Sequence, residues 1–353
     1  MRVLFLGTDR FLFTPGSAAY GRVQDMAAAY PTDTFDCIVF SHRGHGVREA
    51  VAIAPNAHAY PTNSRSRFLY GWDALRIARR ISRPDVVTAQ DPFETGLAGL
   101  TIARRAHAPL LVQVHTDFLS PVFARHSFLN RIRLIIAAYV LPRVRGGYAV
   151  SEKIARAIGR HYVLRKPFDV LPIFVDTSAL ARSPRAPHDR FTMLWAGRLE
   201  PEKRPEEALR ALAAARAHGT DAELIFAGSG SLESTLKEEA KRLDLVDAVT
   251  FAGWQHDLAP YYARTDLLLV TSTYEGYGLV IVEALAAHVP VLSTDVGIAR
   301  EAGAVIAQGD YADALVAWLA GPRASGALAN YPYADKSDYL AKLHAHYAAA
   351  LSV

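Results

Sequence analysis

The stretch TMLWAGRLEPEKRPEEALRALAAARAH, residues 192–218, contains one complete repeat of the fold. It begins with a short apolar run, Thr192–Trp195, that predicts a buried strand. A glycine and a charged loop follow, and Pro205 then opens a helical pattern that continues to His218. A buried strand, a short loop and a helix in this order are typical of a parallel sheet covered by helices.

The same order of strand, loop and helix recurs along the whole chain. The apolar runs that we expect to be strands are Val3–Leu6, Cys37–Phe40, Val86–Ala89, Leu110–Val114, Tyr148–Val150, Thr192–Trp195, Leu224–Ala227, Val249–Phe251, Leu267–Val270 and Val291–Ser293. The helical patterns include Ser66–Ile81, Glu94–Ala106, Asn130–Arg143, Pro205–His218, Leu232–Leu243 and Gly278–Ala287. The sequence therefore predicts an α/β protein with two doubly wound, Rossmann-like domains that face each other across a cleft.

A polar, proline-rich stretch from Ser183 to Asp189 interrupts this series and is interpreted as a linker. We expect an N-terminal domain over residues 1–176 and a second domain over residues 177–334. The remaining residues, 335–353, form an Ala-rich helical pattern with no strand after it. We expect this helix to pack back on the N-terminal domain.

Composition limits the class of protein. The chain has 353 residues, of which 51% are hydrophobic, and this fraction is too high for a disordered protein. The net charge of +4 is mild and does not indicate a nucleic-acid partner. The single cysteine, Cys37, lies in an apolar run, which favours a buried structural thiol in a reducing compartment. No apolar run is long enough to span a membrane, so we expect a cytoplasmic protein.

The segment EGYGLVIVE, residues 275–283, places two glutamates eight positions apart with glycines at the start of a helix. A helical span of this length would separate Glu275 from Glu283 by about 12 Å along the axis, too far for the carboxylate pair of a glycosidase. It suits two contacts at opposite ends of an elongated ligand. Gly276 and Gly278 allow backbone amides to approach that ligand. A helix cap with one surface glutamate would give the same pattern.

The loop from Ala196 to Pro205 combines flexibility with positive charge. Gly197 permits a close approach of the backbone, and Arg198 and Lys203 could both reach a diphosphate. Their positive charge would stabilise a leaving diphosphate as its own charge grows in the transition state. A solvated charged loop is the alternative.

Three weaker signals lie at the ends of other strands. His115 follows the strand Leu110–Val114 and could donate a hydrogen bond to a sugar hydroxyl, or be a structural histidine. Gly228 opens a glycine-rich turn that resembles a dinucleotide fingerprint, but Glu233 replaces its third glycine, which speaks against a dehydrogenase. Gly16 could lie against a phosphate or a sugar, or simply form a turn.

Metal and cofactor motifs are absent from the sequence. It contains no Asp-x-Asp, no His-Glu-x-x-His, no P-loop lysine motif and no cysteine pair. We therefore expect no metal ion and no cofactor, with Arg198 and Lys203 supplying the positive charge instead.

Taken together, these segments resemble the retaining glycosyltransferases of family 4, which have the GT-B fold. The resemblance rests on the loop Gly197–Lys203, the pair Glu275 and Glu283, and Thr294–Gly297, with weaker matches at Gln90–Pro92, His115 and Ala149–Glu152. It implies a hexose transfer from a nucleotide-diphosphate sugar to a glycan, lipid-linked or small-molecule acceptor. It also implies retention of anomeric configuration by front-face displacement, without a metal ion.

The resemblance also implies roles for single residues. Catalytic roles would fall to His115, Glu275, Arg198 and Lys203. Donor contacts would come from Gly16, Gly197, Arg198, Lys203, Gly228, Trp254, Glu275, Gly278, Leu279 and Glu283. Glu283 would hold the ribose hydroxyls, and Trp254 lies in a loop expected to recognise the base. The acceptor would lie on the first domain, with Asp91 and Asp117 as candidate contacts. The chain departs from the family pattern at Ile173–Asp176, Ile298 and Arg300.

A basic segment between Asp117 and Glu152 contains no acidic residue. Its arginines, from Arg125 to Arg145, alternate with large apolar residues. This surface could meet anionic lipid at the inner face of a membrane or a polyprenyl-diphosphate acceptor. Alternatively, it is a crossover helix with its apolar side in the core and its arginines in water.

Two other functions are compatible with the same motifs. A nucleotide-sugar 2-epimerase would convert the donor without any acceptor. A non-catalytic subunit would bind the nucleotide sugar and neither transfer nor hydrolyse it.

Overall fold

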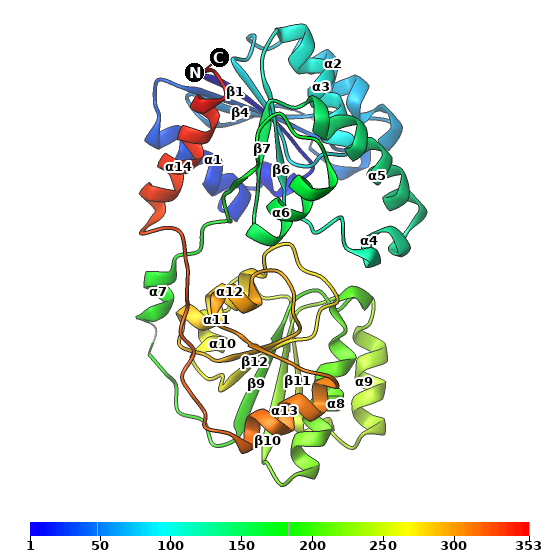
Figure 1. Cartoon of the computed structure of the whole chain (residues 1–353), viewed down its shortest axis with the longest axis vertical. Coiled ribbons are helices and arrows are strands. Elements are labelled where there is room, and N and C mark those ends of the chain that lie inside the picture. The colour runs from blue at the N-terminus through cyan, green and yellow to red at the C-terminus, as the bar shows by residue number, and fades with distance from the viewer. Residues whose placement is uncertain (48, 183, 353) are drawn as a thin grey trace. The chain divides into compact units, whose positions relative to one another are not determined.

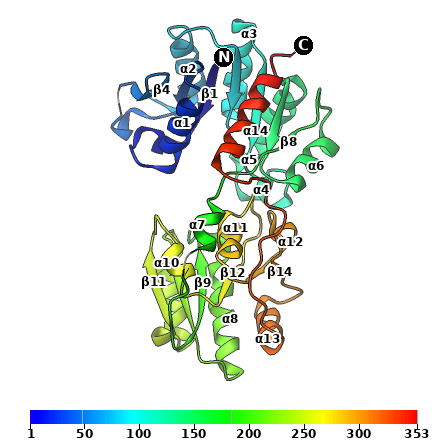
Figure 2. The ribbon, with the colours of Figure 1, turned by 90° about the vertical axis from the view of Figure 1, so that its left-hand side faces the viewer.

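A computed structural model describes residues 1–47, 49–182 and 184–352, which form two compact units (Figure 1). Unit 1 comprises Met1–Pro172 and the described residues from Tyr333 onward, and unit 2 comprises Ile173–Pro332. Both ends of the chain therefore lie in unit 1, as Figures 1 and 2 show. Each unit is built on its own parallel sheet with flanking helices, which confirms the α/β class predicted from the apolar runs.

Unit 1 contains an eight-stranded sheet in the order β3-β4-β2-β1-β5-β6-β7-β8. All neighbouring strands are parallel except β3, which is antiparallel to β4 at one edge. The strands are β1 (Arg2–Gly7), β2 (Thr34–Val39), β3 (Val51–Ala54), β4 (Ala57–Pro61), β5 (Val86–Ala89), β6 (Leu110–Val114), β7 (Gly146–Ala149) and β8 (Asp169–Val170).

The helices of unit 1 lie on both faces of this sheet. They are α1 (Ala18–Ala29), α2 (Tyr70–Ala78), α3 (Glu94–Ala106), α4 (Pro121–His126), α5 (Phe128–Val140), α6 (Glu152–His161) and α14 (Lys336–Ala349), with 3-10 turns η1 (Arg10–Phe13), η2 (Arg43–His45), η3 (Arg67–Leu69) and η4 (Leu141–Arg143). Residues of α1 and α14 share one apolar cluster with Val86 and Leu111. Gly99 of α3 packs against Val87 and Leu110, whose side chains point the opposite way.

The C-terminal helix α14 packs along α1. The imidazole of His344 stacks on the ring of Tyr30 with 3.6 Å between centroids, and its Nε2 lies 2.7 Å from Asp33. Lys336 is paired with Asp25 of α1 at 2.9 Å. Residues more than 300 positions apart in the sequence thus share one side of the unit 1 sheet.

Unit 2 contains a six-stranded parallel sheet in the order β11-β10-β9-β12-β13-β14. Its strands are β9 (Phe191–Ala196), β10 (Ala222–Ala227), β11 (Val249–Gly253), β12 (Leu267–Val270), β13 (Val291–Ser293) and β14 (Val305–Ile306). Its helices are α7 (Thr177–Ala181), α8 (Pro205–Ala217), α9 (Glu233–Arg242), α10 (Ala259–Tyr262), α11 (Leu279–Ala286), α12 (Ala299–Ala302) and α13 (Tyr311–Ala320), with turns η5 (Pro201–Lys203) and η6 (Val246–Ala248).

The core of unit 2 has two layers because successive strand residues point to opposite faces. Met193 and Trp195 of β9 pack with Leu209 of α8 and Leu315 of α13. Leu194 and its neighbours pack on the other face with Ile281 of α11. The continuous apolar runs of the sequence follow from this burial on both faces.

The structure contains elements that the sequence patterns did not indicate. β3 and β4 lie at a sheet edge and are rich in alanine, and β8 and β14 have two residues each, so none of them carries a strong strand signal. The helix expected over Ser66–Ile81 consists of the turn η3 and the helix α2. Cys37 is buried, as predicted, and burial raises the pKa of its thiol to about 12.

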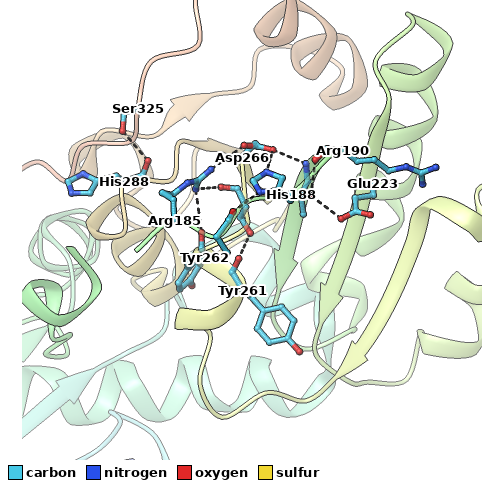
Figure 3. Close-up of polar contacts among 12 residues, drawn as sticks. Arg185, His188, Arg190, Glu223, Tyr261, Tyr262, Asp266, His288 and Ser325 are labelled. Carbon is cyan, nitrogen blue, oxygen red and sulfur yellow. Dashed lines mark hydrogen bonds and ion pairs between the residues drawn. The ribbon is translucent and has the colours of Figure 1, made fainter. Parts of the chain in front are cut away.

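The proline-rich stretch interpreted as a linker is bound to unit 2 (Figure 3). Ser183 lies outside the described residues, but Arg185 and His188 bind Asp266, the residue that precedes β12, and the amide of Ala186 donates to the carbonyl of Ala263 at 2.8 Å. Asp266 receives hydrogen bonds from Arg185 at 3.1 Å, from His188 Nε2 at 2.7 Å and from the amide of Thr192 at 2.9 Å. The division between the units falls at Pro172–Ile173 and at Pro332–Tyr333, whereas the sequence patterns predicted boundaries after residues 176 and 334. Prolines and polar residues indicate that a segment is irregular. Whether the segment is a free linker or is attached to a domain depends on long-range contacts such as those of Asp266.

Candidate active site

The candidate donor residues gather at the carboxyl ends of the strands of unit 2, where ligands of parallel sheets bind. Gly197 follows β9 with φ of 153°, and Gly228 follows β10. A Cβ atom on Gly228 would lie 1.8 Å from the carbonyl oxygen of Gly197. Gly228 is therefore required by the packing of two backbone loops, independently of any ligand.

Hydrogen bonds hold the loop that follows Gly197 against the next loop. The amide of Leu199 donates to the carbonyl of Ser229 at 3.0 Å. The carboxylate of Glu200 accepts from the amide of Ser231 at 3.0 Å and from its hydroxyl at 2.7 Å. These bonds from Ser231 lower the pKa of Glu200. The loop is thus a defined structure rather than a freely solvated chain.

Lys203 and Glu275 form an ion pair between the loops after β9 and β12. Nζ of Lys203 lies 2.5 Å from Oε1 of Glu275, and the two side chains are 19% and 15% exposed. The hydroxyl of Ser272 donates to the same Oε1 at 2.8 Å. Thr271 donates to the carbonyl of Lys203 at 2.7 Å and accepts from the indole of Trp195 at 3.0 Å. The backbone and the side chain of Lys203 are therefore both positioned.

Arg198 is also paired with a carboxylate. Its Nη2 lies 2.9 Å from Oε1 of Glu202, and its side chain is 63% exposed whereas that of Glu202 is 8% exposed. The carbonyl of Glu202 accepts from the amide and the hydroxyl of Thr273 at 2.8 Å and 3.0 Å. Each of the two predicted diphosphate-binding cations thus has an acidic partner in the ligand-free protein.

The first turn of α11 offers backbone amides at the same end of the sheet. Gly278 precedes the helix in a left-handed conformation, φ 94°, and Leu279 is its first residue. Within the described part of the chain, no side chain caps this helix N-terminus. Gly297, also left-handed, lies so close that a Cβ atom would come within 2.2 Å of the Tyr277 carbonyl oxygen. A helix N-terminus of this kind attracts negative charge.

Glu283 and Trp254 complete the predicted donor set. The carboxylate of Glu283, on α11, accepts a hydrogen bond from the hydroxyl of Tyr262 at 2.8 Å, and burial raises its pKa. Trp254 directly follows β11, and its side chain is 57% exposed. An exposed indole at this position could stack on a nucleobase.

The remaining predicted residues belong to unit 1, where they follow β1, β5 and β6. Gly16 has φ of 82° and precedes Ser17, whose side chain caps α1. Asp91 accepts from the amide of Phe93 at 2.7 Å, and burial raises the pKa of its carboxyl to about 6. Burial also raises the pKa of Asp117.

His115 directly follows β6 and is half-buried. Its Nε2 lies 3.1 Å from Oε1 of Gln113, and its ring meets that of Tyr148 edge-on with 6.0 Å between centroids. Burial, with a smaller contribution from the charge of Arg22, lowers the pKa of His115 to about 4. The imidazole is therefore neutral at physiological pH.

Sequence reasoning missed several polar partners of the predicted residues. Thr271 and Ser272 position Lys203 and Glu275, and Tyr262 binds Glu283. The signal for the first two was present, since hydroxyl residues directly follow the apolar run of β12 at the end where ligands bind. Tyr262 carries no comparable signal, because its contact to Glu283 depends on how α10 and α11 pack.

The described residues contain no helix long and apolar enough to cross a bilayer. Among the same residues, no group of three or more His, Cys, Asp or Glu side chains could hold a metal ion.

Two family models match the chain, and their matches overlap at residues 176–179. The model described as Glycosyltransferase Family 4 matches residues 22–179, and the model described as Glycosyl transferases group 1 matches residues 176–317. Together they include the candidate residues from Asp91 to Glu283. The chain belongs to glycosyltransferase family 4. These matches do not favour an epimerase or a non-catalytic binding subunit.

Curated proteins with glycosyltransferase names match part of the chain. Alpha-monoglucosyldiacylglycerol synthase of Streptococcus pneumoniae is 27% identical over 242 residues, which cover 62% of this chain and 54% of that protein. D-inositol 3-phosphate glycosyltransferase 2 of Catenulispora acidiphila is 35% identical over 167 residues, which cover 42% of this chain and 39% of that protein. The matched part is thus about half of these relatives or less.

Solved structures share the whole fold. Sucrose-phosphate synthase from Thermosynechococcus elongatus superposes with a TM-score of 0.73 at 18% identity, covering 99% of this chain and 96% of that one. HepE of Anabaena, solved in complex with UDP and glucose, superposes with a TM-score of 0.68 at 19% identity. The superposition covers 98% of this chain and 95% of that one. At this identity the likeness shows the shared GT-B fold.

Proposed function

We propose that this chain transfers a hexose from a nucleoside diphosphate sugar to an acceptor hydroxyl, with retention at the anomeric carbon and without a metal ion. The observation that carries the proposal is that Arg198, Lys203, Glu275 and the first turn of α11 all lie at the carboxyl ends of the unit 2 strands, where Lys203 contacts Glu275. Cations and helix N-terminal amides at the carboxyl ends of parallel strands can neutralise the negative charge of a diphosphate. Glu275, beside the same amides, matches the hydroxyls of the attached sugar.

The proposed reaction needs only these groups and the two substrates. The bond between the anomeric carbon and the diphosphate breaks, and the acceptor oxygen bonds to the same face of the sugar. The acceptor proton passes to the departing phosphate. Arg198 and Lys203 stabilise the charge that develops on the diphosphate, which is the kind of interaction that lowers a transition state most.

Other residues fill the remaining roles in this proposal. Glu283 binds the ribose and Trp254 the base, while the backbone at Gly16, Gly197, Gly278 and Leu279 approaches the donor. In unit 1, His115 contacts the donor sugar, and Asp91 and Asp117 contact the acceptor. Gly228 acts through packing, because its contact with Gly197 shapes the loop that carries Arg198.

The test is a screen of UDP- and GDP-sugars by thermal shift, followed by transfer assays with excess chelator. A matching donor raises the melting temperature by mass action, and transfer continues in the chelator. Lys203→Ala and Arg198→Ala should each lose about tenfold to a hundredfold in donor affinity or turnover, because each removes a charge-assisted hydrogen bond. Arg210→Ala is the matched control, since Arg210 pairs with Glu207 on α8. Full activity of both test variants would contradict the proposal.

We further propose that α5 attaches the protein peripherally to the inner face of a membrane, which would bring a lipid-linked acceptor within reach. Large apolar side chains line the exposed side of this helix at intervals of three and four residues; this stripe consists of Phe128, Ile132, Ile135 and Tyr139. Arg125, Arg131 and Arg143 beside it are also exposed. The crossover-helix alternative placed the apolar side in the core, whereas α5 leaves these residues in solvent.

Charge and apolar area together favour an anionic bilayer as the partner of this stripe. The similarity to a monoglucosyldiacylglycerol synthase is in keeping with a lipid acceptor. We expect the protein to sediment with vesicles containing phosphatidylglycerol at low salt and to be released by high salt. Phe128→Ser with Ile135→Ser should abolish sedimentation, whereas Val163→Ser, at another exposed apolar position in unit 1, should not. If neutral vesicles retained the protein equally well, attraction between the arginines and anionic lipid would be excluded as a contribution to binding.

A further inference from the structure

A buried chain of polar side chains runs behind His115 in unit 1. Thr88 of β5 is fully buried and Gln113 of β6 is 5% exposed. Nε2 of Gln113 lies 3.1 Å from the hydroxyl oxygen of Thr88, and Oε1 of Gln113 lies 3.1 Å from Nε2 of His115. Neither Thr88 nor Gln113 faces solvent, so their role must be to position something else or to stabilise the sheet.

The amide of Gln113 has only one oxygen, and this restricts the state of His115. With the amide nitrogen directed at Thr88, the oxygen can only accept, so Nε2 of His115 must carry a hydrogen. A neutral imidazole has one such hydrogen, which leaves Nδ1 with a free lone pair. We propose that Thr88 and Gln113 are positioning residues that hold His115 as its Nε2–H tautomer, so that Nδ1 accepts a hydrogen bond from a hydroxyl of the donor sugar.

The charged surroundings support a neutral ring. The titratable groups that face His115 are Arg22 of α1 and Tyr148 of β7. Burial and the positive charge of Arg22 both lower the pKa of His115, to about 4. Burial raises the pKa of Tyr148 well above its usual range, so the phenol is also neutral. Among the described residues, the only charge that acts on the pKa of His115 is that of Arg22, so no carboxylate competes with Gln113 for a hydrogen of the ring.

A fixed lone pair on Nδ1 of His115 would make the site selective among donor sugars. A site with a fixed lone pair selects a hydroxyl and rejects a group that cannot donate, because the buried acceptor would stay unpaired. The sugar contact rests on the function proposed above, whereas the tautomer itself does not. A donor that lacks the contacted hydroxyl should therefore be a poor substrate of the native protein.

The first experiment needs neither a substrate nor a variant that turns over. ¹⁵N-labelled histidine in the full chain is observed by NMR near pH 7, and the signal of His115 is assigned by its loss in His115→Gln. We expect hydrogen on Nε2 and a bare Nδ1. A signal showing hydrogen on Nδ1, or a fully protonated ring, would overturn the proposal even if the protein proves to be an active transferase.

Variants of Gln113 then test the link to turnover. Gln113→Met removes the acceptor, and we expect a mixed tautomer with kcat lowered by about tenfold to a hundredfold and KM changed little. Gln113→Glu restores an acceptor and adds a charge, which keeps the Nε2–H tautomer but raises the pKa of His115. Its activity should therefore be rescued at high pH and lost as the pH falls through the raised value.

Thr88 provides a second route to the same test. Thr88→Val keeps the shape but removes the partner of the amide nitrogen, and Thr88→Ser restores a hydroxyl. In Thr88→Val we expect a mixture of tautomers and a reduced kcat. In Thr88→Ser we expect the Nε2–H tautomer and the native kcat to return. An unchanged tautomer in both Gln113→Met and Thr88→Val would refute the assigned roles, whereas a correct tautomer without any transfer activity would refute only the proposed function.

Discussion

Nζ of Lys203 lies 2.5 Å from Oε1 of Glu275, across 72 positions of sequence. The pair joins the loop after β9 to the loop after β12, and both side chains are mostly withdrawn from solvent. Arg198 has a similar partner in Glu202. The candidate diphosphate site is therefore close to neutral before a ligand binds, and an incoming diphosphate has to compete with carboxylates for both cations.

This competition predicts that removing one carboxylate strengthens nucleotide binding. Glu202→Gln keeps the size of the side chain but releases Arg198, and we expect about threefold to tenfold tighter binding of UDP or GDP, the energy of one partly exposed ion pair. Titration calorimetry at two salt concentrations checks this. Glu233→Gln, which disrupts a surface pair with Lys237, is the control and should have no effect. Weaker binding in Glu202→Gln would show that the glutamate supports the site directly.

We expect the buried carboxylate of Asp91 to lower the free energy of unfolding at neutral pH. Its carboxyl has a pKa of about 6 in the folded chain against 3.8 in an unfolded one, because burial disfavours the charged form. The folded state thus binds the proton more tightly, and this group lowers stability as the pH rises from about 4 to above 6. Asp91→Asn should match the native protein at pH 4 and exceed it at pH 8 by on the order of 1–3 kcal/mol.

Thermal unfolding of Asp91→Asn across that pH range provides the measurement. If Asp91 also binds the acceptor, the variant should lose transfer while gaining stability, a trade-off expected of a strained functional group. Equal melting temperatures of variant and native protein at pH 8 would mean that the carboxylate is better compensated than its burial implies.

His188 gives unit 2 a stability contribution with the opposite pH dependence. Its hydrogen bonds to the carbonyl of Ala186 and to Asp266 raise its pKa above 6.5. This contribution is complete below pH 6.5 and is lost as the pH rises through the raised value. We expect the melting temperature of the native protein to fall by a few degrees more than that of His188→Asn between pH 6 and pH 9. His256→Asn, at an exposed position, should retain the native pH dependence.

Gly228→Ala should destabilise unit 2 because its Cβ atom would lie 1.8 Å from the Gly197 carbonyl oxygen. Neither backbone can move without breaking the loop that carries Arg198, so we expect a loss of about 3 kcal/mol together with weaker donor binding. Gly219→Ala is the control, since a Cβ atom on Gly219 would meet open space and only its left-handed conformation, φ 87°, resists a side chain. It should cost only about 1 kcal/mol. Denaturant unfolding compares the two.

Most of the strands and helices could be predicted from local patterns in the sequence. Apolar runs and helical periods depend on residues within one element, which is why β9, α8 and the carboxyl-end positions of Lys203, His115 and Glu275 could be predicted. The edge strand β3 and its neighbour β4 could not, because alanine-rich segments of this length have little preference of their own. The stretch after Ser183 was misinterpreted as a linker for a similar reason, since its attachment depends on Asp266, a distant residue.

The sequence by itself determined the α/β class, the resemblance to family 4 and the residue types of the candidate site, because each of these depends on short-range order and spacing. Only the tertiary structure decided that Lys203 meets Glu275, that Thr88 and Gln113 stand behind His115, and that α5 keeps an apolar stripe in solvent. The physical reason is that pairing, burial and the charge state of a side chain depend on neighbours that the folded chain brings from far along the sequence.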